Sequence, residues 1–200
     1  MNIIYTIGHS HHSLEEFFGL VSKYDINVLF DVRSTPYSRH AAQFNREFLQ
    51  ERLDNTSVKY FFMGKFFGAR PDDKSLYSPS GVLDFEKVAK SEKFIKGVNS
   101  TLIGIEQGNR ICLMCSEKEP IECHRTILVA RAFYELGIMV RHILADGTFL
   151  EQADIEKKLL DIYFPDRQQY SMFDEKKLSN EDYLNLAYKK RNADIGYNIN

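Results

Sequence analysis

The chain has 200 residues, of which 44% are hydrophobic, and its formal net charge is −2. These values are typical of one globular domain with a buried core, and they exclude a chain-wide electrostatic attraction to nucleic acid or to an anionic membrane. Apolar runs are too short to cross a membrane, and residues 1–7 lack the features of a signal peptide. We therefore expect a cytoplasmic protein without a membrane partner, whose three cysteines are reduced thiols.

Strands and helices alternate in the first half of the predicted structure. Residues 3–7 are an apolar, β-branched run that ends at Gly8, which indicates a buried strand. A capping box at Ser13 and apolar side chains at helical spacing predict a helix over residues 13–24. A second buried strand is expected over residues 27–30, which makes a right-handed parallel unit. The other elements expected in this half are a helix capped by Asn45, a strand over 58–62 and a long loop over 63–83.

The second half continues the same alternation. One or two helices are expected over 85–105, then a strand over 110–115, a helix over 126–136, a strand over 138–144 and a helix over 150–163. This order predicts an α/β fold in three layers, with a doubly wound, mainly parallel five-stranded sheet and helices on both faces. We expect a single α/β domain over 1–164 and a polar C-terminal tail over 165–200, with one short helix near 181–188.

Polar side chains follow the predicted strands at the points where the strands end. They are His9 and Ser10 after the first strand, Asp31, Arg33 and Ser34 after the second, and Cys115 and Glu117 after the fourth. In open α/β sheets, ligands bind beyond the carboxyl ends of the strands. These segments are therefore expected to meet at one edge of the sheet and to form a site there.

The tripeptide Cys123-His124-Arg125 begins a predicted helix. A helix N-terminus favours an anion, and a thiol there beside a histidine and an arginine should have a lowered pKa. A thiolate at Cys123 could be a nucleophile or a metal ligand, and Arg125 could hold a phosphate or carboxylate by two hydrogen bonds. These features predict a hydrolase or transferase that acts on an anionic substrate, such as a nucleotide or nucleic acid. Its expected catalytic residues are His9, Asp31, Arg33, Cys115, Glu117, Cys123, His124 and Arg125, and its expected anion-binding residues are Ser10, Ser34, Arg39 and Arg70.

The spacing of Cys112, Cys115 and Cys123-His124 also invites a zinc interpretation. Cys112 and Cys115, however, lie in an apolar strand, where residues three apart face opposite sides, so Cys112 is expected in the core. No cofactor is favoured on this pattern. The metal alternative, zinc or iron, would use Cys115, Cys123, His124 and His9. His142 lies inside the last predicted strand and is interpreted as a core residue whose hydrogen bonds are satisfied.

An ordered set of short motifs resembles one family. The set comprises Thr6-Ile7-Gly8-His9-Ser10, Asp31-Val32-Arg33-Ser34 with Pro36 and Ser38-Arg39, Phe44, the loop from Gly68 to Arg70, Cys115-x-Glu117 with Cys123-His124-Arg125, and His142-Ile143 with Gly147. Together these motifs, over about residues 3–150, are similar to the bacterial and archaeal family called domain of unknown function 488. The family usually has two adjacent glycines where this chain has Phe67-Gly68. Its name implies no activity, so the resemblance supports positions: His9, Asp31, Arg33, Arg39, Cys115, Glu117, Cys123, His124 and Arg125.

The predicted tail contains a second short motif. Gln169-Tyr170-Ser171-Met172-Phe173 is similar to the peptide by which many bacterial repair and replication proteins bind the sliding clamp. Gln169, Met172 and Phe173 would be the contacts, as apolar anchors of a tail that docks in a groove. The structural alternative is that Met172 and Phe173 pack on the domain. A nucleic-acid-associated binding module recruited to the clamp therefore stands beside the enzyme and the metal protein as a third hypothesis.

Overall fold

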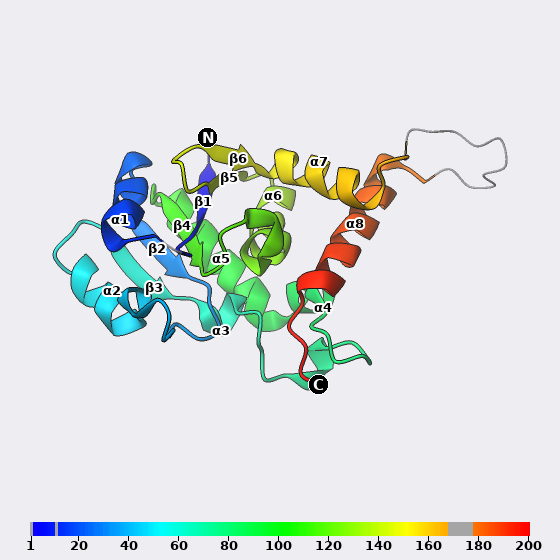
Figure 1. The fold of residues 1–200 in the computed structure, drawn as a ribbon, viewed down its shortest axis with the longest axis horizontal. Helices are drawn as coiled ribbons and strands as arrows, with labels where there is room; N and C mark the ends of the chain where they lie inside the picture. The colour runs from blue at the N-terminus through cyan, green and yellow to red at the C-terminus, as the bar shows by residue number, and fades with distance from the viewer. Residues whose placement is uncertain (1, 11, 168–177) are drawn as a thin grey trace.

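The computed structural model describes residues 2–10, 12–167 and 178–200 as one sheet covered by helices (Figure 1). The strands are β1 (Ile3–Gly8), β2 (Val28–Asp31), β3 (Lys59–Phe62), β4 (Ile111–Cys115), β5 (Met139–Ile143) and β6 (Phe149–Glu151). The helices are α1 (Leu14–Lys23), α2 (Arg46–Leu53), α3 (Gly64–Phe67), α4 (Phe85–Ala89), α5 (Glu92–Glu106), α6 (Arg131–Glu135), α7 (Gln152–Tyr163) and α8 (Asn180–Ile195). Four short helical turns are η1 (Ala42–Phe44), η2 (Lys74–Leu76), η3 (Pro120–Glu122) and the π-helical η4 (Arg125–Ala130).

The sheet has six strands in the order β3-β2-β4-β1-β5-β6, in which β1 to β5 are parallel and β6 is antiparallel to β5. The predicted α/β class is confirmed, but the five-stranded sheet is corrected to a six-stranded mixed one. The sequence does not predict the sixth strand, because residues 150–151 also fit the pattern of the following helix. Gly147, with a φ of 78°, closes the turn that brings Phe149 back beside Ile143.

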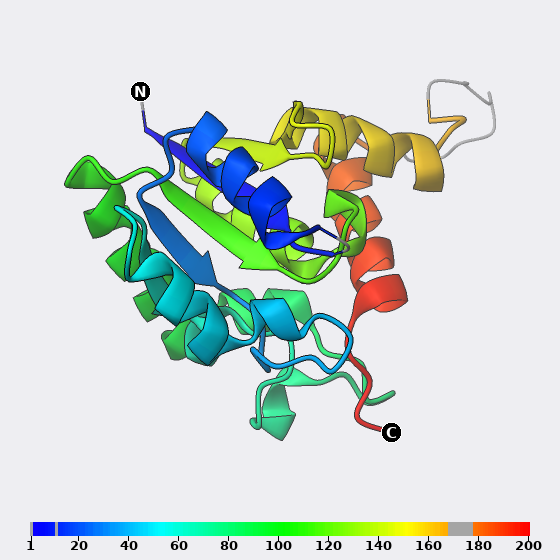
Figure 2. The same ribbon diagram turned by 60° about the vertical axis from the view of Figure 1, so that its left-hand side comes forward.

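Helices cover both faces of the sheet (Figure 2), and a separate hydrophobic core lies on each face. On one face, Phe17 of α1 and Leu49 of α2 pack with Tyr5 and Ile7 of β1. On the other face, residues of α3 to α8 and η4 pack against Ile4, Ile111 and the other strand residues whose side chains point to that face. Alternating side chains of a buried parallel strand supply both cores, which accounts for the continuous apolar runs in the sequence.

Residues 63–83 are more structured than the long loop that the sequence predicts. They contain α3 and η2, and Phe67 of α3 is fully buried against Phe94 of α5, with ring centroids 5.4 Å apart. Gly97 of α5 makes room for α3, because a Cβ there would lie 2.7 Å from the side chain of Phe66 and 2.9 Å from the ring of Phe67. The segment therefore belongs to the core of this face.

Helix α8 is longer than the short helix expected near 181–188, and a buried relay of hydrogen bonds joins it to the sheet. His142 of β5 bonds Thr6 Oγ1 through Nδ1 at 2.9 Å and Gln152 Oε1 through Nε2 at 2.8 Å. Gln152 Nε2 then donates to the hydroxyl of Tyr188 on α8, at 2.8 Å. Tyr188 in turn donates to Glu156 Oε1 at 3.1 Å. Both ring nitrogens of His142 are thus partnered, as its interpretation as a core residue requires.

Among the described residues, no helix has the length and apolar character needed to cross a bilayer.

Candidate metal and anion site at the carboxyl edge

Parallel register brings the predicted site segments to one edge of the sheet. Gly8 of β1 is paired with Cys115 of β4, and Asp31 of β2 is paired with Met114. The backbone continues this pairing past the strands, since His9 N–H donates to the Cys115 carbonyl at 2.9 Å. Side-chain alternation nevertheless divides the predicted residues between the two faces of the sheet. The result is a thiol cluster on the α5–α6 face and a histidine–arginine cluster on the α1–α2 face.

The thiol cluster consists of Cys115, Cys123 and His124. Cys115 ends β4, and the turn η3, which has Pro120 at its start, brings the chain back so that Cys123 and His124 precede η4. The Nδ1 atom of His124 lies 3.8 Å from Cys115 Sγ and 3.9 Å from Cys123 Sγ. One ligand atom from each of the three residues falls within 4.8 Å of the other two. This cluster could hold a metal ion.

The orientation of the His124 ring is fixed by the end of β2. Nε2 of His124 lies 3.2 Å from the carbonyl oxygen of Val32. A carbonyl only accepts, so Nε2 must carry the proton, and Nδ1 then presents its lone pair toward the two thiols. A backbone carbonyl in this role is one of the usual partners of a metal-bound imidazole.

The two thiols of the cluster have opposite pKa shifts. The contact with Cys123 and burial raise the pKa of Cys115. Burial alone would raise the pKa of Cys123, but the hydrogen bond from Cys115 and the charge of Arg125 hold it well below its usual value. Cys123 is therefore the more acidic thiol of the pair. Cys112 is fully buried in the core of the opposite face, as the strand alternation predicts, and burial raises its pKa.

Arg125 is fully buried and holds the loop after β4. Its Nη1 donates to the carbonyl of Glu117 at 2.6 Å and its Nη2 to that of Lys118 at 3.1 Å. The two terminal nitrogens expected to clamp an anion are thus bonded to backbone carbonyls. Glu117 itself is exposed, and its carboxylate is not part of the cluster that could hold a metal ion.

The histidine–arginine cluster contains a buried ion pair. Arg33 donates to Asp31 through Nε at 2.8 Å and Nη2 at 2.6 Å, and Tyr60 donates to the same carboxylate at 2.7 Å. Arg33 Nη1 also lies 3.1 Å from His9 Nε2, and the His9 ring stacks on Phe44 with centroids 4.4 Å apart. His9 therefore does not join the thiol cluster, because its ring faces Phe44 and Arg33 rather than Cys115.

Acid is expected to destabilise the fold through two neutral histidines. Burial and the charge of a nearby arginine, Arg33 for His9 and Arg125 for His142, lower the pKa of His9 to about 4 and that of His142 to about 3 from 6.5. Below pH 6.5 the unfolded chain binds protons that the folded chain does not, so stability falls as the pH falls toward these values. Between pH 7 and pH 5, each histidine should remove about 2 kcal/mol from the free energy of unfolding.

Urea unfolding of the wild type and of His9→Gln at both pH values measures this effect. The His9→Gln variant should lose about 2 kcal/mol less than the wild type on acidification, whereas His12→Gln should follow the wild type. An equal loss in His9→Gln and the wild type would show that His9 is not held neutral.

The remaining predicted anion-binding residues do not form one surface. The hydroxyl of Ser34 accepts a hydrogen bond from Arg70 N–H at 2.9 Å, and the Arg70 guanidinium stacks over Tyr197 at 4.6 Å. Arg39 lines a separate shallow cavity of about 540 Å³. Ser10, with a φ of 30°, donates its backbone N–H to the Ser116 carbonyl and so holds the two loops together. The predicted clamp contacts Gln169, Met172 and Phe173 lie outside the described residues.

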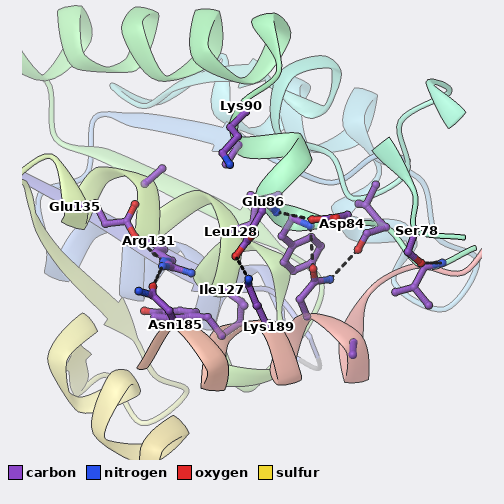
Figure 3. A pocket seen from close by; sticks show the side chains of 18 of the residues that line it. Ser78, Asp84, Glu86, Lys90, Ile127, Leu128, Arg131, Glu135, Asn185 and Lys189 are labelled. Carbon is purple, nitrogen blue, oxygen red and sulfur yellow. Dashed lines mark hydrogen bonds and ion pairs between the residues drawn. The ribbon is translucent and has the colours of Figure 1, made fainter. Parts of the chain in front are cut away.

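A larger groove, of about 750 Å³, lies between α4, η4 with α6, and α8 (Figure 3), and its lining does not include the residues of the thiol cluster. Ile127 and Leu128 contribute to its apolar wall, and Lys189 of α8 pairs with Glu86 of α4 at 3.3 Å. Arg131 donates to Glu135 and Asn185 at its other end. The charges that line this groove are thus largely paired with one another.

Two groups that contact the site are not predicted by the sequence. Tyr60 is expected in a strand but not at the site, although a polar hydroxyl near the end of an apolar strand is a usable signal. No sequence pattern points to the Val32 carbonyl, because every residue has a backbone carbonyl. Phe44 appears only among the family motifs.

The fold and the site define a mixed-sheet α/β protein with a Cys-Cys-His cluster at the carboxyl edge of its parallel strands. Residues 13–132 match the family described as Domain of unknown function DUF488, and the chain belongs to this family. Searches of curated proteins and of solved structures gave no match.

Proposed function

We propose that the protein is a metal-dependent hydrolase or transferase in which Cys115, Cys123 and His124 bind one zinc ion. The observation that supports this most directly is the spacing of the three ligand atoms. A tetrahedral zinc ion with Zn–S bonds of about 2.3 Å and Zn–N bonds of about 2.0–2.1 Å holds sulfur and nitrogen about 3.6 Å apart. The two Sγ–Nδ1 distances of 3.8 and 3.9 Å are close to this value.

The chemistry of the donor set also favours zinc. Thiolate and imidazole ligands suit zinc, and iron would be the alternative occupant. Three protein ligands leave one tetrahedral position open, as in catalytic zinc sites rather than in closed structural ones. When bound, zinc would supply a polarised substrate oxygen or an activated water molecule. The residues of this chain fix the ligands: Val32 orients His124, and Arg125 holds the loop that follows Cys115.

The competing proposal is a metal-free thiol enzyme with Cys123 as the nucleophile. The lowered pKa of Cys123, which the hydrogen bond from Cys115 and the charge of Arg125 produce, favours it. Against it stands the 1% exposure of Cys123, since a nucleophile must reach its substrate. In both proposals an anionic substrate, such as a nucleotide, is a prediction from the sequence.

Metal analysis of the purified full-length protein tests the proposal. We expect about one zinc per chain in the wild type and in Cys112→Ala, and at least a tenfold loss of zinc in Cys115→Ala, Cys123→Ala and His124→Ala. Cys112→Ala is the matched control, because it removes a thiol of the same strand from the other face of the sheet. Equal zinc loss in Cys112→Ala, or a wild type without zinc or iron, would contradict it. Rapid alkylation of Cys123 by iodoacetamide in a metal-free protein would instead support the thiol enzyme.

A further inference from the structure

His9 presents a buried hydrogen-bond donor without a partner. Arg33 Nη1 lies 3.1 Å from His9 Nε2, and because a guanidinium has only donors, Nε2 must be the acceptor. The imidazole is then neutral and carries its proton on Nδ1. Burial and the charge of Arg33 lower the pKa of the ring, and a contact with the backbone of Ser10 partly opposes them. The contact with Ser10 does not meet the geometry of a hydrogen bond. Nδ1 therefore has no hydrogen-bond partner in the described part of the chain, although only 3% of His9 is exposed.

The surroundings of His9 hold this donor in one orientation. Asp31 binds two nitrogens of Arg33, and Arg33 Nη2 also donates to the Phe44 carbonyl at 2.8 Å. Phe44 stacks on the His9 ring at an interplanar angle of 13°. An unpaired buried donor is destabilising, and native proteins contain few of them. The core histidine of the same chain, His142, has both of its nitrogens bonded.

The position of His9 points to the chemistry of the missing acceptor. Its backbone follows β1 at the carboxyl edge, hydrogen-bonded to Cys115, where α/β sheets bind their ligands. Arg125 lies close to this point of the chain, since its Nη2 would be 3.2 Å from a Cβ on Gly8, and its charge contributes to the lowered pKa of His9. Among the described residues, no carboxylate forms a salt bridge with Arg125, and its Nε also lacks a partner. A neutral donor near a cation that has no carboxylate partner among the described residues suits the oxygen of an anion.

We propose that His9 binds an oxyanion of the substrate, a phosphate or carboxylate group, through its Nδ1–H, and that Asp31, Arg33 and Phe44 are positioning residues for this contact. The inference rests on the proposed function only for the identity of that anion as the substrate. His9 is thereby a hydrogen-bond donor rather than a general base or a metal ligand. The thiol cluster would bind the metal on one face of the sheet, and His9 would bind the oxyanion on the other.

Nuclear magnetic resonance of the full-length protein labelled with ¹⁵N-histidine tests the contact at pH 7. We expect the His9 proton on Nδ1, and we expect its resonance to shift saturably as inorganic phosphate or acetate is added. His142 is the internal control, because it is also buried and both of its ring nitrogens are bonded, and its resonances should not move. By calorimetry, His9→Ala should weaken phosphate binding about ten- to hundredfold, the range for one hydrogen bond to a charged group, while His12→Ala should not.

A proton on Nε2 of His9 would overturn the inference. So would an Nδ1–H resonance that neither anion moves, including the case in which it contacts only a bound water molecule. Zinc content is measured separately and should be unchanged in His9→Ala. If the protein lacks zinc but phosphate still shifts the His9 resonance, the proposed metal function fails and the oxyanion contact stands. If the protein binds zinc but phosphate does not shift the His9 resonance, the oxyanion contact fails and the metal function stands.

Discussion

Replacing Asp31 by asparagine is expected to lower the free energy of unfolding by about 3–5 kcal/mol. The carboxylate is fully buried, and it accepts three side-chain hydrogen bonds, two from Arg33 and one from Tyr60. Asparagine keeps the shape but removes the charge, so the guanidinium of Arg33, only 4% exposed, is left in the core without its counterion. Urea unfolding at pH 7 measures the loss.

Two further variants separate charge burial from simple loss of a contact. Glu92 and Lys96 form an exposed ion pair on α5, with side chains 82% and 64% exposed, and Glu92→Gln should change stability by less than about 1 kcal/mol. The double variant Asp31→Leu with Arg33→Met removes both buried charges and should recover much of the loss. If Asp31→Asn is no more destabilising than Glu92→Gln, the ion pair does not have the buried character that its geometry indicates.

The second large effect is expected at Gly8. A Cβ at this position would lie 1.9 Å from the carbonyl oxygen of Glu117, which Arg125 holds by a 2.6 Å hydrogen bond. Because that carbonyl is fixed and the strand is paired on both sides, neither partner can move without breaking hydrogen bonds. Gly8→Ala should therefore destabilise the protein by about 3 kcal/mol, at the upper end for overpacking of a core.

Gly19 provides the matched substitution. It lies in α1, and the place that a Cβ would occupy there has no neighbouring atom within 4 Å, so alanine should stabilise the helix by about 0.5–1 kcal/mol. Thermal unfolding should move the two variants in opposite directions. A Gly8→Ala protein as stable as the wild type would show that the loop after β4 is not held by Arg125.

Much of the fold follows from local sequence patterns. The apolar runs that form β1, β2 and β4 and the capping box at Ser13 are local signals, and each element lies where the sequence predicts it. The strand β6 could not be predicted in this way, since its three residues are assigned by pairing with β5 rather than by their own pattern. The docking of α8 likewise depends on Tyr188 reaching Gln152, a contact between residues 36 positions apart.

Local sequence patterns predict the location of the site but not the grouping of its side chains. Strand ends and the order of polar residues are enough to predict that His9, Asp31 and Cys115 meet at one edge. Which face each side chain occupies depends on register, and the grouping of Cys115, Cys123 and His124 without His9 follows from it. The bonding of Arg125 to two backbone carbonyls could not be predicted from residue types, because the acceptors belong to the main chain.

The end of β2 has a consequence for how the two clusters respond to ligands. Asp31 and Arg33 contribute side chains to one cluster, and the carbonyl of Val32 between them orients His124 in the other. A ligand that limits the motion of either cluster therefore also limits the motion of the backbone at residues 31–33. Binding at one cluster should favour binding at the other through shared ordering, a positive thermodynamic coupling that requires no change in shape. Slower amide hydrogen exchange at Arg33, whose N–H donates to Asp31, would report it from either side.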